Sequence, residues 1–415
     1  EVFGNAVRAA ESGRPGAVFI GLPKDVGLAS AAVVAQAGVG RRVRLGHPDS
    51  EEVSLALALI NQAKRPLVLL GLQSSEPSCA EALKRFLDQT DLPYVSTFQG
   101  AGAWAEPKRG GQYGGRVGLF SNQPADRLLE AADCVLAIGY DPVEYDPEAW
   151  NKGHARPLIV IDTVASDQDR SFLPATELIG DIGLSLDALG SKLSRHVDPD
   201  FDGLVAQAAL ELAETVAEGS AFHGFPVHPL RVIDELRKVV TPETTLALDV
   251  GSHYIWMNRY FPASRARQVL VSNGQQTLGV ALPWAIATGI ARPGYPVISI
   301  SGDGGFLFSA MELETAKRIG SRFVHLIWNS ASYDMVEFQE QAHYGDTAGV
   351  ALGHYDVVAF AKSFGCEGYR ITDPNQLGPV LLKALGSPVP VLIDIPIDYS
   401  DNPQLMQNVR QEFLS

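Results

Sequence analysis

The sequence predicts an α/β protein built from doubly wound parallel sheets. Short apolar runs alternate with longer amphipathic segments along most of the chain, which is typical of parallel βαβ units whose strands are buried on both faces. The chain has 415 residues, 46% of them hydrophobic, with 40 glycines and 26 prolines. That length suits two or three domains, and the glycines and prolines suit many tight connections.

The first segment resembles the end of a larger unit. A helix is expected over residues 2–10, and an apolar strand over 17–22 that ends at Pro23. One helix and one strand cannot enclose a core. They therefore either join another sheet or belong to a domain whose earlier part is missing. We predict residues 1–46 to be this segment and a linker.

The next stretch contains enough strands for one complete doubly wound domain, which we predict over residues 47–205. Its expected helices cover 51–63, 77–89 and a segment ending at Leu193, and its expected strands cover 66–71, 93–96, 134–139, 158–162 and 177–181. Residues 206–226 are predicted to be a linker, although 202–219 has a helical pattern.

The last domain is predicted over residues 227–415. Pro229 suits the first turn of a helix, and five further apolar runs indicate a second parallel sheet. Its strands are expected over 245–249, 269–272, 297–301, 323–328 and 389–394.

Composition excludes several classes of function. A net charge of −15 without a basic stripe argues against nucleic-acid and anionic-membrane binding. We expect no membrane span, because no run of about 18 apolar residues occurs, and we expect no signal peptide. Cys79, Cys134 and Cys366 lie far apart without metal-ligand spacing, which predicts reduced thiols in a cytoplasmic protein.

The most informative motif is Gly302-Asp303-Gly304-Gly305, which joins an apolar strand to a helix. Glycines let a backbone approach a ligand closely, and the free N–H groups at a helix start favour phosphate. An Asp at the carboxyl end of a strand can hold the divalent cation that neutralises a diphosphate. Taken alone, the motif fits an ordinary strand-to-helix turn equally well. The helix is expected to bury Phe306, Ala310, Leu313, Ala316 and Ile319.

A second turn shifts this balance towards a ligand site. Asn329 ends the next apolar strand, and 24 residues separate it from Gly304. One helix and one strand of that length return the chain to the same edge of the sheet, where open α/β sheets bind ligands. The paired motifs resemble the fingerprint of thiamin-diphosphate enzymes.

Longer motifs resemble the acetolactate synthases, most closely the catabolic, FAD-independent branch. The similarity covers the whole chain. The motifs begin at Gly118 (Gly-Leu-Phe-Ser-Asn-Gln), Gly139 (Gly-Tyr-Asp-Pro-Val-Glu-Tyr), Asp249 (Asp-Val-Gly-Ser-His-Tyr-Ile-Trp), Ser272 (Ser-Asn-Gly-Gln-Gln-Thr-Leu-Gly) and Asp398 (Asp-Tyr-Ser-Asp-Asn).

The resemblance implies a thiamin-diphosphate-binding fold with a central domain followed by a diphosphate-binding domain. It implies thiamin diphosphate and Mg²⁺ as cofactors, without FAD. It also implies that two pyruvate molecules form 2-acetolactate and CO₂ through a cofactor-bound enamine, in a homodimer or homotetramer whose sites are shared between chains. The family's catalytic Glu belongs to the earlier part of the pyrimidine-binding domain, so no residue here is assigned that role. The chain is therefore expected to be truncated and inactive alone.

The resemblance also assigns roles to individual residues. Asp303 is the side-chain ligand of Mg²⁺, the Gln276 carbonyl accepts a hydrogen bond from the cofactor's 4′-amino group, and Leu278 supports the bent cofactor. The residues expected to bind the cofactor are Val250, Gly251, Ser252, Gln276, Leu278, Gly302, Asp303, Gly304, Gly305, Ser330, Ser332, Tyr333, Asp334 and Met335.

Two positions depart from the wider family pattern. Ser330 stands where Asn or Asp is usual, and a hydroxyl is a weaker ligand for a hard cation. Ser330 is the preferred metal ligand beside the Ser332 carbonyl, with neighbouring Asn329 as the alternative. Gln339 stands where biosynthetic relatives carry Trp, which implies pyruvate as the second substrate. His228 and His253 have no metal or triad spacing, so packing or helix capping is expected of them.

Several alternatives remain open from the sequence. Another thiamin-diphosphate-dependent 2-keto-acid decarboxylase or oxidase would share the Gly-Asp-Gly site. A catalytically incomplete cofactor-binding chain and a flavin-binding synthase are the other two.

Overall fold

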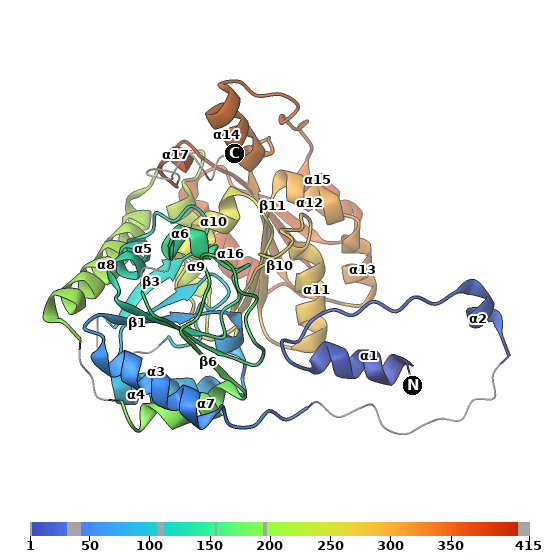
Figure 1. Ribbon diagram of the computed structural model, residues 1–415. Coiled ribbons are helices and arrows are strands. Elements are labelled where there is room, and N and C mark those ends of the chain that lie inside the picture. The colour runs from blue at the N-terminus through green and yellow to red at the C-terminus, as the bar shows by residue number, and fades with distance from the viewer. Residues whose placement is uncertain (1, 31–42, 106–111, 154–155, 194–196, 406–415) are drawn as a thin grey trace.

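A computed structural model describes residues 2–30, 43–105, 112–153, 156–193 and 197–405. Most of these residues form two units, each with a six-stranded sheet in which all pairings are parallel (Figure 1). The expected doubly wound α/β architecture is confirmed. None of the helices in these ranges is long and apolar enough to cross a membrane.

The central unit has the strand order β3-β2-β1-β4-β5-β6. Its strands are β1 Pro66–Leu70, β2 Tyr94–Thr97, β3 Tyr113–Val117, β4 Cys134–Ile138, β5 Leu158–Asp162 and β6 Thr176–Ile179. Its helices are α3 Ser50–Gln62, η1 Leu72–Ser75, α4 Ala80–Thr90, α5 Pro124–Ala131, α6 Pro147–Trp150, α7 Ile182–Gly190, α8 Pro199–Glu218 and η2 Gly219–Ala221.

The second unit has the strand order β11-β12-β10-β9-β7-β8. Its strands are β7 Thr245–Leu248, β8 Val269–Leu270, β9 Val297–Gly302, β10 Val324–Asn329, β11 Glu367–Arg370 and β12 Val391–Pro396. Its helices are α9 Pro229–Val239, α10 Ser252–Tyr260, α11 Ala281–Ala291, α12 Asp303–Ser309, α13 Glu312–Arg318, α14 Asp334–Tyr344, α15 Val357–Ser363, η3 Pro374–Gln376, α16 Leu377–Leu385 and α17 Asn402–Leu405.

Helices cover both faces of each sheet. In the central unit, α3, α4 and α7 pack on one face and α5, α6 and α8 on the other. In the second unit, α9, α10 and α16 pack on one face and α11, α12, α13 and α15 on the other. The inner strands are therefore buried on both sides, which explains why they are continuous apolar runs instead of alternating ones.

The two units are joined through a buried arginine. Arg116 of β3 donates to the carbonyl oxygens of Asn258 and Phe261, each at 2.6 Å. Both acceptors lie at the carboxyl end of α10, where the helix leaves its last carbonyls without partners inside the helix. This contact fixes α10, whose first residue is Ser252, against the central sheet.

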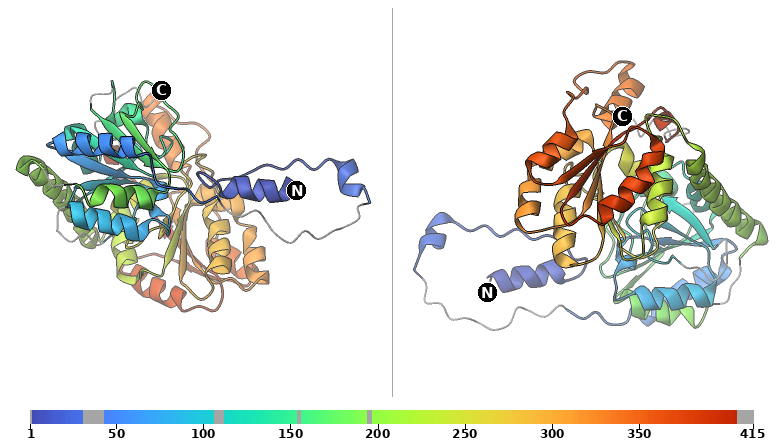
Figure 2. Two further views of the ribbon diagram at one scale, coloured as in Figure 1. Left: turned by 60° about the horizontal axis from the view of Figure 1, so that its bottom comes forward. Right: turned by 180° about the vertical axis from the view of Figure 1, so that it is seen from behind.

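The N-terminal segment differs from its expected form. The helix is present as α1 Val2–Glu11, but residues 17–22 are not a strand. A strand needs a hydrogen-bonded neighbour, and these residues have none within the described part of the chain; Phe19 is 96% exposed. Helices α1 and α2 Lys24–Leu28 lie outside both layered units (Figure 2). Residues 31–42 of the predicted linker lie outside the described residues.

One more expectation needs correction. The helix after the Gly-Asp-Gly-Gly motif is divided into α12 and α13, and Ile319 is 43% exposed, whereas the other four apolar positions are buried. The helical pattern expected over residues 202–219 is present as α8, whose first half packs into the central core. The domain boundaries themselves stay predictions.

Candidate functional site

Three neighbouring strands of the second sheet end at the residues that the motifs singled out. Strand β9 lies between β7 and β10, and all three run parallel. Their carboxyl ends therefore meet at one edge and bring together 249–252, 302–305 and 329–335. This edge is the one at which open α/β sheets bind ligands.

Glycines shape the floor of this site. Gly251 has φ +146°, a conformation that side-chain-bearing residues rarely adopt, and a Cβ there would lie 3.0 Å from the His253 ring. A Cβ on Gly304 would lie 2.4 Å from the Tyr333 ring, and one on Gly305 would lie 3.1 Å from the Asp249 carboxyl carbon. The backbone here is accessible only because side chains are absent.

Asp303 joins two of the three strand ends. One carboxylate oxygen accepts the Gly304 N–H at 3.0 Å, and the other accepts the Ala331 N–H at 2.6 Å. Burial raises the pKa of Asp303 to about 6, and the nearby Asp394 adds to the effect. A buried carboxylate held in this way is suited to neutralisation by a cation.

Oxygen atoms of the loop after β10 lie beside Asp303. The Ser330 hydroxyl donates to the Ser332 carbonyl oxygen at 3.3 Å, so these two oxygens are adjacent. Asn329 is engaged elsewhere, because its amide donates to Asp394 on β12 at 2.9 Å and its carbonyl oxygen accepts the Ala331 N–H at 3.1 Å. The Asn329 side chain is thus engaged at both its nitrogen and its oxygen, whereas the hydrogen bonds of the Ser330 hydroxyl among the described residues are to Ser332.

The loop between β8 and α11 carries Gln276 and Leu278. Gln276 is exposed, Leu278 is half-buried, and Gln276 has φ +46°, a conformation that is uncommon for residues other than glycine. One end of the loop is held by the buried Asp249, which accepts the N–H groups of Gly279 at 2.9 Å and Ala281 at 3.3 Å. The loop thereby lies against the carboxyl end of β7.

The other end of this loop reaches the central unit through Asn273. Its amide donates to the Glu144 carbonyl oxygen at 2.9 Å, and its carbonyl oxygen accepts the Tyr254 hydroxyl at 2.6 Å. The loop that carries Gln276 is therefore fixed at both ends by buried or half-buried partners.

Helix α14 contributes the remaining expected residues. Tyr333 and Asp334 lie at its start, Met335 packs against the core of the second unit, and Gln339 is exposed. Burial raises the pKa of Asp334 to about 6, opposed by hydrogen bonds from Ser252. One oxygen of Asp334 has no hydrogen-bond partner within the described ranges.

Sequence reasoning gave no role to Asp249, whereas the packing that it expected of His253 is confirmed. His253 is fully buried beneath Gly251 and Gly302, and neither ring nitrogen makes a well-formed hydrogen bond within the described part of the chain. Burial lowers the pKa of the ring to about 3, and its effect exceeds the opposing one of the Asp249 backbone. His228, in contrast, caps α9 as expected, accepting the Leu230 N–H at 3.2 Å.

The observed groups fit a magnesium diphosphate. The glycines leave space that a Cβ would fill, and the His253 ring, whose nitrogens have no hydrogen-bond partner among the residues that the structure describes, lies beside Gly251 and Gly302. The Asp303 carboxylate, Ser330 hydroxyl and Ser332 carbonyl are hard oxygen donors of the kind that Mg²⁺ binds. No cluster of three or more His, Cys, Asp or Glu that could hold a metal occurs among the residues described.

Comparison with known families agrees with this geometry. Residues 249–395 match the family described as thiamine pyrophosphate enzyme, C-terminal TPP binding domain, and residues 53–189 match its central domain. An acetolactate synthase of Bacillus subtilis is 42% identical over 412 residues, which is 97% of this chain and 70% of that protein. The chain belongs to the acetolactate synthase family.

Other members of the acetolactate synthase family are also similar to this chain over nearly its whole length. The catabolic acetolactate synthase of Raoultella terrigena is 41% identical, over 98% of this chain and 72% of that protein. A probable acetolactate synthase large subunit of Methanococcus aeolicus is 28% identical, over 96% of this chain and 70% of its own length. The expected family and its thiamin-diphosphate-dependent enzyme class are thus confirmed.

Proposed function

We propose that the protein condenses two molecules of pyruvate to 2-acetolactate with release of CO₂. The observation that carries the proposal is the meeting of three motif-bearing strand ends, β7, β9 and β10, in a chain that is 42% identical to an acetolactate synthase. Bound thiamin diphosphate would supply the carbon nucleophile and stabilise the charge left by decarboxylation.

The chain's own residues would bind and orient the cofactor. Backbone N–H groups of Gly304 and Gly305, at the start of α12, and the hydroxyl and N–H of Ser252, at the start of α10, suit a diphosphate. The Gln276 carbonyl would accept a hydrogen bond from the cofactor's 4′-amino group, and Leu278 would support its bent form. Val250, Gly302 and Tyr333 would complete the walls.

The metal ligands we propose are Asp303, Ser330 and the Ser332 carbonyl. Asp303 supplies the only carboxylate in this set, so the site carries less negative charge than one with Asp at residue 330. We propose Mg²⁺ as the ion, because all three donors are oxygens.

The polar, exposed Gln339 on α14 supports pyruvate as the second substrate. A bulky indole at this place would narrow the space beside the cofactor. We therefore expect Gln339→Trp to change the choice of the second keto acid, measured by competition between pyruvate and 2-ketobutyrate.

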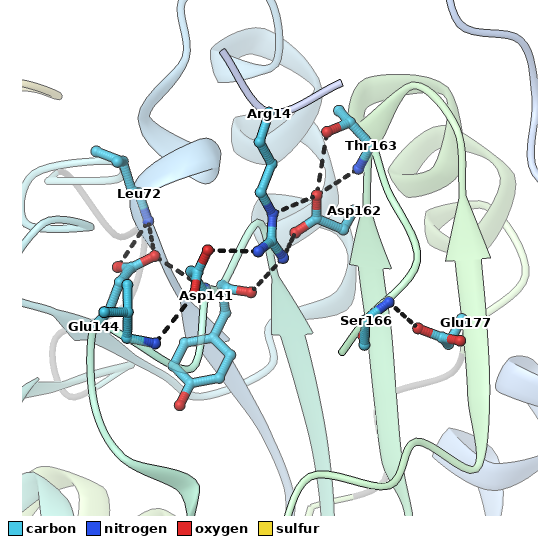
Figure 3. A network of polar contacts seen from close by, with 10 residues as sticks. Arg14, Leu72, Asp141, Glu144, Asp162, Thr163, Ser166 and Glu177 are labelled. Carbon is cyan, nitrogen blue, oxygen red and sulfur yellow. Dashed lines mark hydrogen bonds and ion pairs between the residues drawn. The ribbon is translucent and has the colours of Figure 1, made fainter. Parts of the chain in front are cut away.

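We propose that FAD is not needed. The central strand order is that of dinucleotide-binding sheets, which bind ligands between β1 and β4. Here the Glu144 carboxylate already accepts the Leu72 N–H at 3.0 Å, just after β1, and Arg14 lies between Asp141 and Asp162 at the ends of β4 and β5 (Figure 3). These paired side chains near the ends of β1, β4 and β5 support the proposal, because a dinucleotide bound there would have to displace them.

We also propose a cytoplasmic homodimer or homotetramer with shared sites. The three cysteines are unpaired and buried, which agrees with a reducing compartment. Beside the cofactor edge, Leu307, Phe308 and Met311 are 43%, 56% and 62% exposed. A second copy of the chain would cover this apolar surface.

Product analysis with ¹³C-labelled pyruvate, thiamin diphosphate and Mg²⁺ tests the proposal. We expect labelled 2-acetolactate and CO₂ in a 1:1 ratio. Acetaldehyde or acetyl phosphate would instead indicate a decarboxylase or an oxidase. Cofactor binding without consumption of pyruvate would support a catalytically incomplete chain.

A further inference from the structure

The motif Asp398–Asn402 ends with a buried asparagine that contacts the first turn of α10. Asn402 is 4% exposed. Its amide donates to the Ser252 hydroxyl oxygen at 2.8 Å, and its carbonyl oxygen accepts the Trp256 indole N–H at 2.9 Å. Both side-chain ends of Asn402 are therefore committed to residues one turn apart on the same helix.

Because the Asn402 amide donates to it, the Ser252 hydroxyl must direct its own hydrogen to a different acceptor. A hydroxyl has one hydrogen to donate and two lone pairs that accept. Because the Asn402 amide can only donate, it occupies a lone pair and leaves the hydrogen free. That hydrogen can then be donated to an anion at the start of α10, where an anion is favoured. The Asp334 carboxylate is such a group nearby, and its interaction with Ser252 lowers its pKa against the larger effect of burial.

The segment around Asn402 is anchored independently of it. Asp401 lies 3.1 Å from the His228 Nε2 atom, and the Leu405 carbonyl oxygen accepts from Arg259 at 3.0 Å and from Asn122 at 2.9 Å. Loss of the Asn402 amide would therefore remove its orienting effect without releasing the segment.

We infer that Asn402 is a positioning residue for the diphosphate, because it holds the Ser252 hydroxyl as a donor toward the anion. The inference rests on the proposed function, since it assigns the diphosphate to the start of α10. Asn402 itself does not touch the cofactor in this scheme; it acts through Ser252.

A double-mutant cycle on cofactor affinity separates this role from a general structural one. Isothermal titration with thiamin diphosphate at fixed Mg²⁺ gives the Kd of the unaltered protein and of the Asn402→Ala, Ser252→Ala and double variants. We expect each single substitution to raise the Kd about five- to tenfold. The double variant should bind no more weakly than Ser252→Ala alone.

A matched control removes the other hydrogen bond of the same amide. Trp256→Phe leaves the Asn402–Ser252 contact, so we expect a lower melting temperature with a Kd within twofold of the unaltered protein. Asn402→Asp is nearly isosteric and should fold, but its carboxylate would accept the Ser252 hydrogen and raise the Kd further than Asn402→Ala does.

The outcomes distinguish failure of this inference from failure of the proposed function. Additive effects in the double variant, an equal loss in Trp256→Phe, or unchanged binding by Asn402→Asp would overturn the inference while leaving the proposed function intact. If the unaltered protein does not bind thiamin diphosphate, the proposed function fails and this inference fails with it.

Discussion

The Asp303 carboxylate accepts the backbone N–H of Ala331 at 2.6 Å. This hydrogen bond joins the end of β9 to the loop that follows β10, which carries Ser330 and Ser332. Ala331 has φ +59°, a conformation that a non-glycine residue adopts only when its surroundings hold it there. The proposed metal ligands are thus linked through backbone geometry before any ion binds.

Asp303→Asn should abolish metal-dependent cofactor binding. The substitution keeps the size of the side chain but removes the only carboxylate among the proposed ligands, so we expect at least a 100-fold rise in the Kd for Mg²⁺, about 2.7 kcal/mol. Titration with Mg²⁺ at saturating thiamin diphosphate measures this. Glu314→Gln, an exposed position on α13, is the control and should change nothing; a similar loss there would contradict the assignment.

Ser330→Asp should strengthen metal binding. A carboxylate is a better ligand for Mg²⁺ than a neutral hydroxyl, and we expect about a tenfold lower Kd, about 1.4 kcal/mol. Ser330→Ala should change affinity in the opposite direction. Equal affinities for all three proteins in a calorimetric titration would show that residue 330 does not contact the metal.

Glu144→Gln should remove a pH dependence of stability. Burial raises the pKa of Glu144 from 4.5 to about 7, so the folded state holds a proton that the unfolded state has released. Its contribution is fully present below pH 4.5 and is lost as the pH rises towards 7, about 3 kcal/mol in all. Urea unfolding between pH 5 and about 8 should show the free energy of unfolding of the variant falling less steeply than that of the unaltered protein.

Arg14→Ala should destabilise the protein through Asp162. Asp162 is fully buried, and Arg14 donates to it at 2.8 Å and 3.3 Å. Removal of the cation leaves a buried charge without its counter-ion, at a cost of about 3 kcal/mol. In an Asp162→Asn background the same substitution should cost less than about 1 kcal/mol.

Urea denaturation measures each of these free energies. The exposed pair Arg170–Glu148 provides the control, because Arg170→Ala should cost less than about 1 kcal/mol. The coupling between Arg14 and Asp162 would be refuted by equal losses in both backgrounds.

The inner strands could be predicted because burial on both faces makes them continuous apolar runs, as in β1, β4 and β5. Strand β3 was missed because it contains two glycines and Arg116, whose charge is accommodated only by carbonyl groups of α10 far along the chain. Edge strand β11 was missed because its residues are half-buried or exposed.

The site was predictable where motifs mark backbone conformation, as at Gly302–Gly305. It was less predictable where burial decides the role. Asp249 and His253 lie inside a motif that was quoted, but only the packing shows that Asp249 holds the Gly279 and Ala281 amides. It also shows that the His253 ring lies beneath the glycines without a hydrogen-bond partner among the described residues. No local pattern distinguishes such residues from ordinary core residues.

The strand order β10-β9-β7 also fixes the distances between the parts of the site. Neighbouring strands in a sheet lie about 4.8 Å apart, and the ladder fixes Gly302 opposite Trp328 and Ile300 opposite Leu248. The span between the metal loop and the α10 start is therefore a multiple of the strand spacing and does not depend on any one side chain. Side chains at residues such as 330 can be exchanged during evolution, or by design, without altering the width of the site.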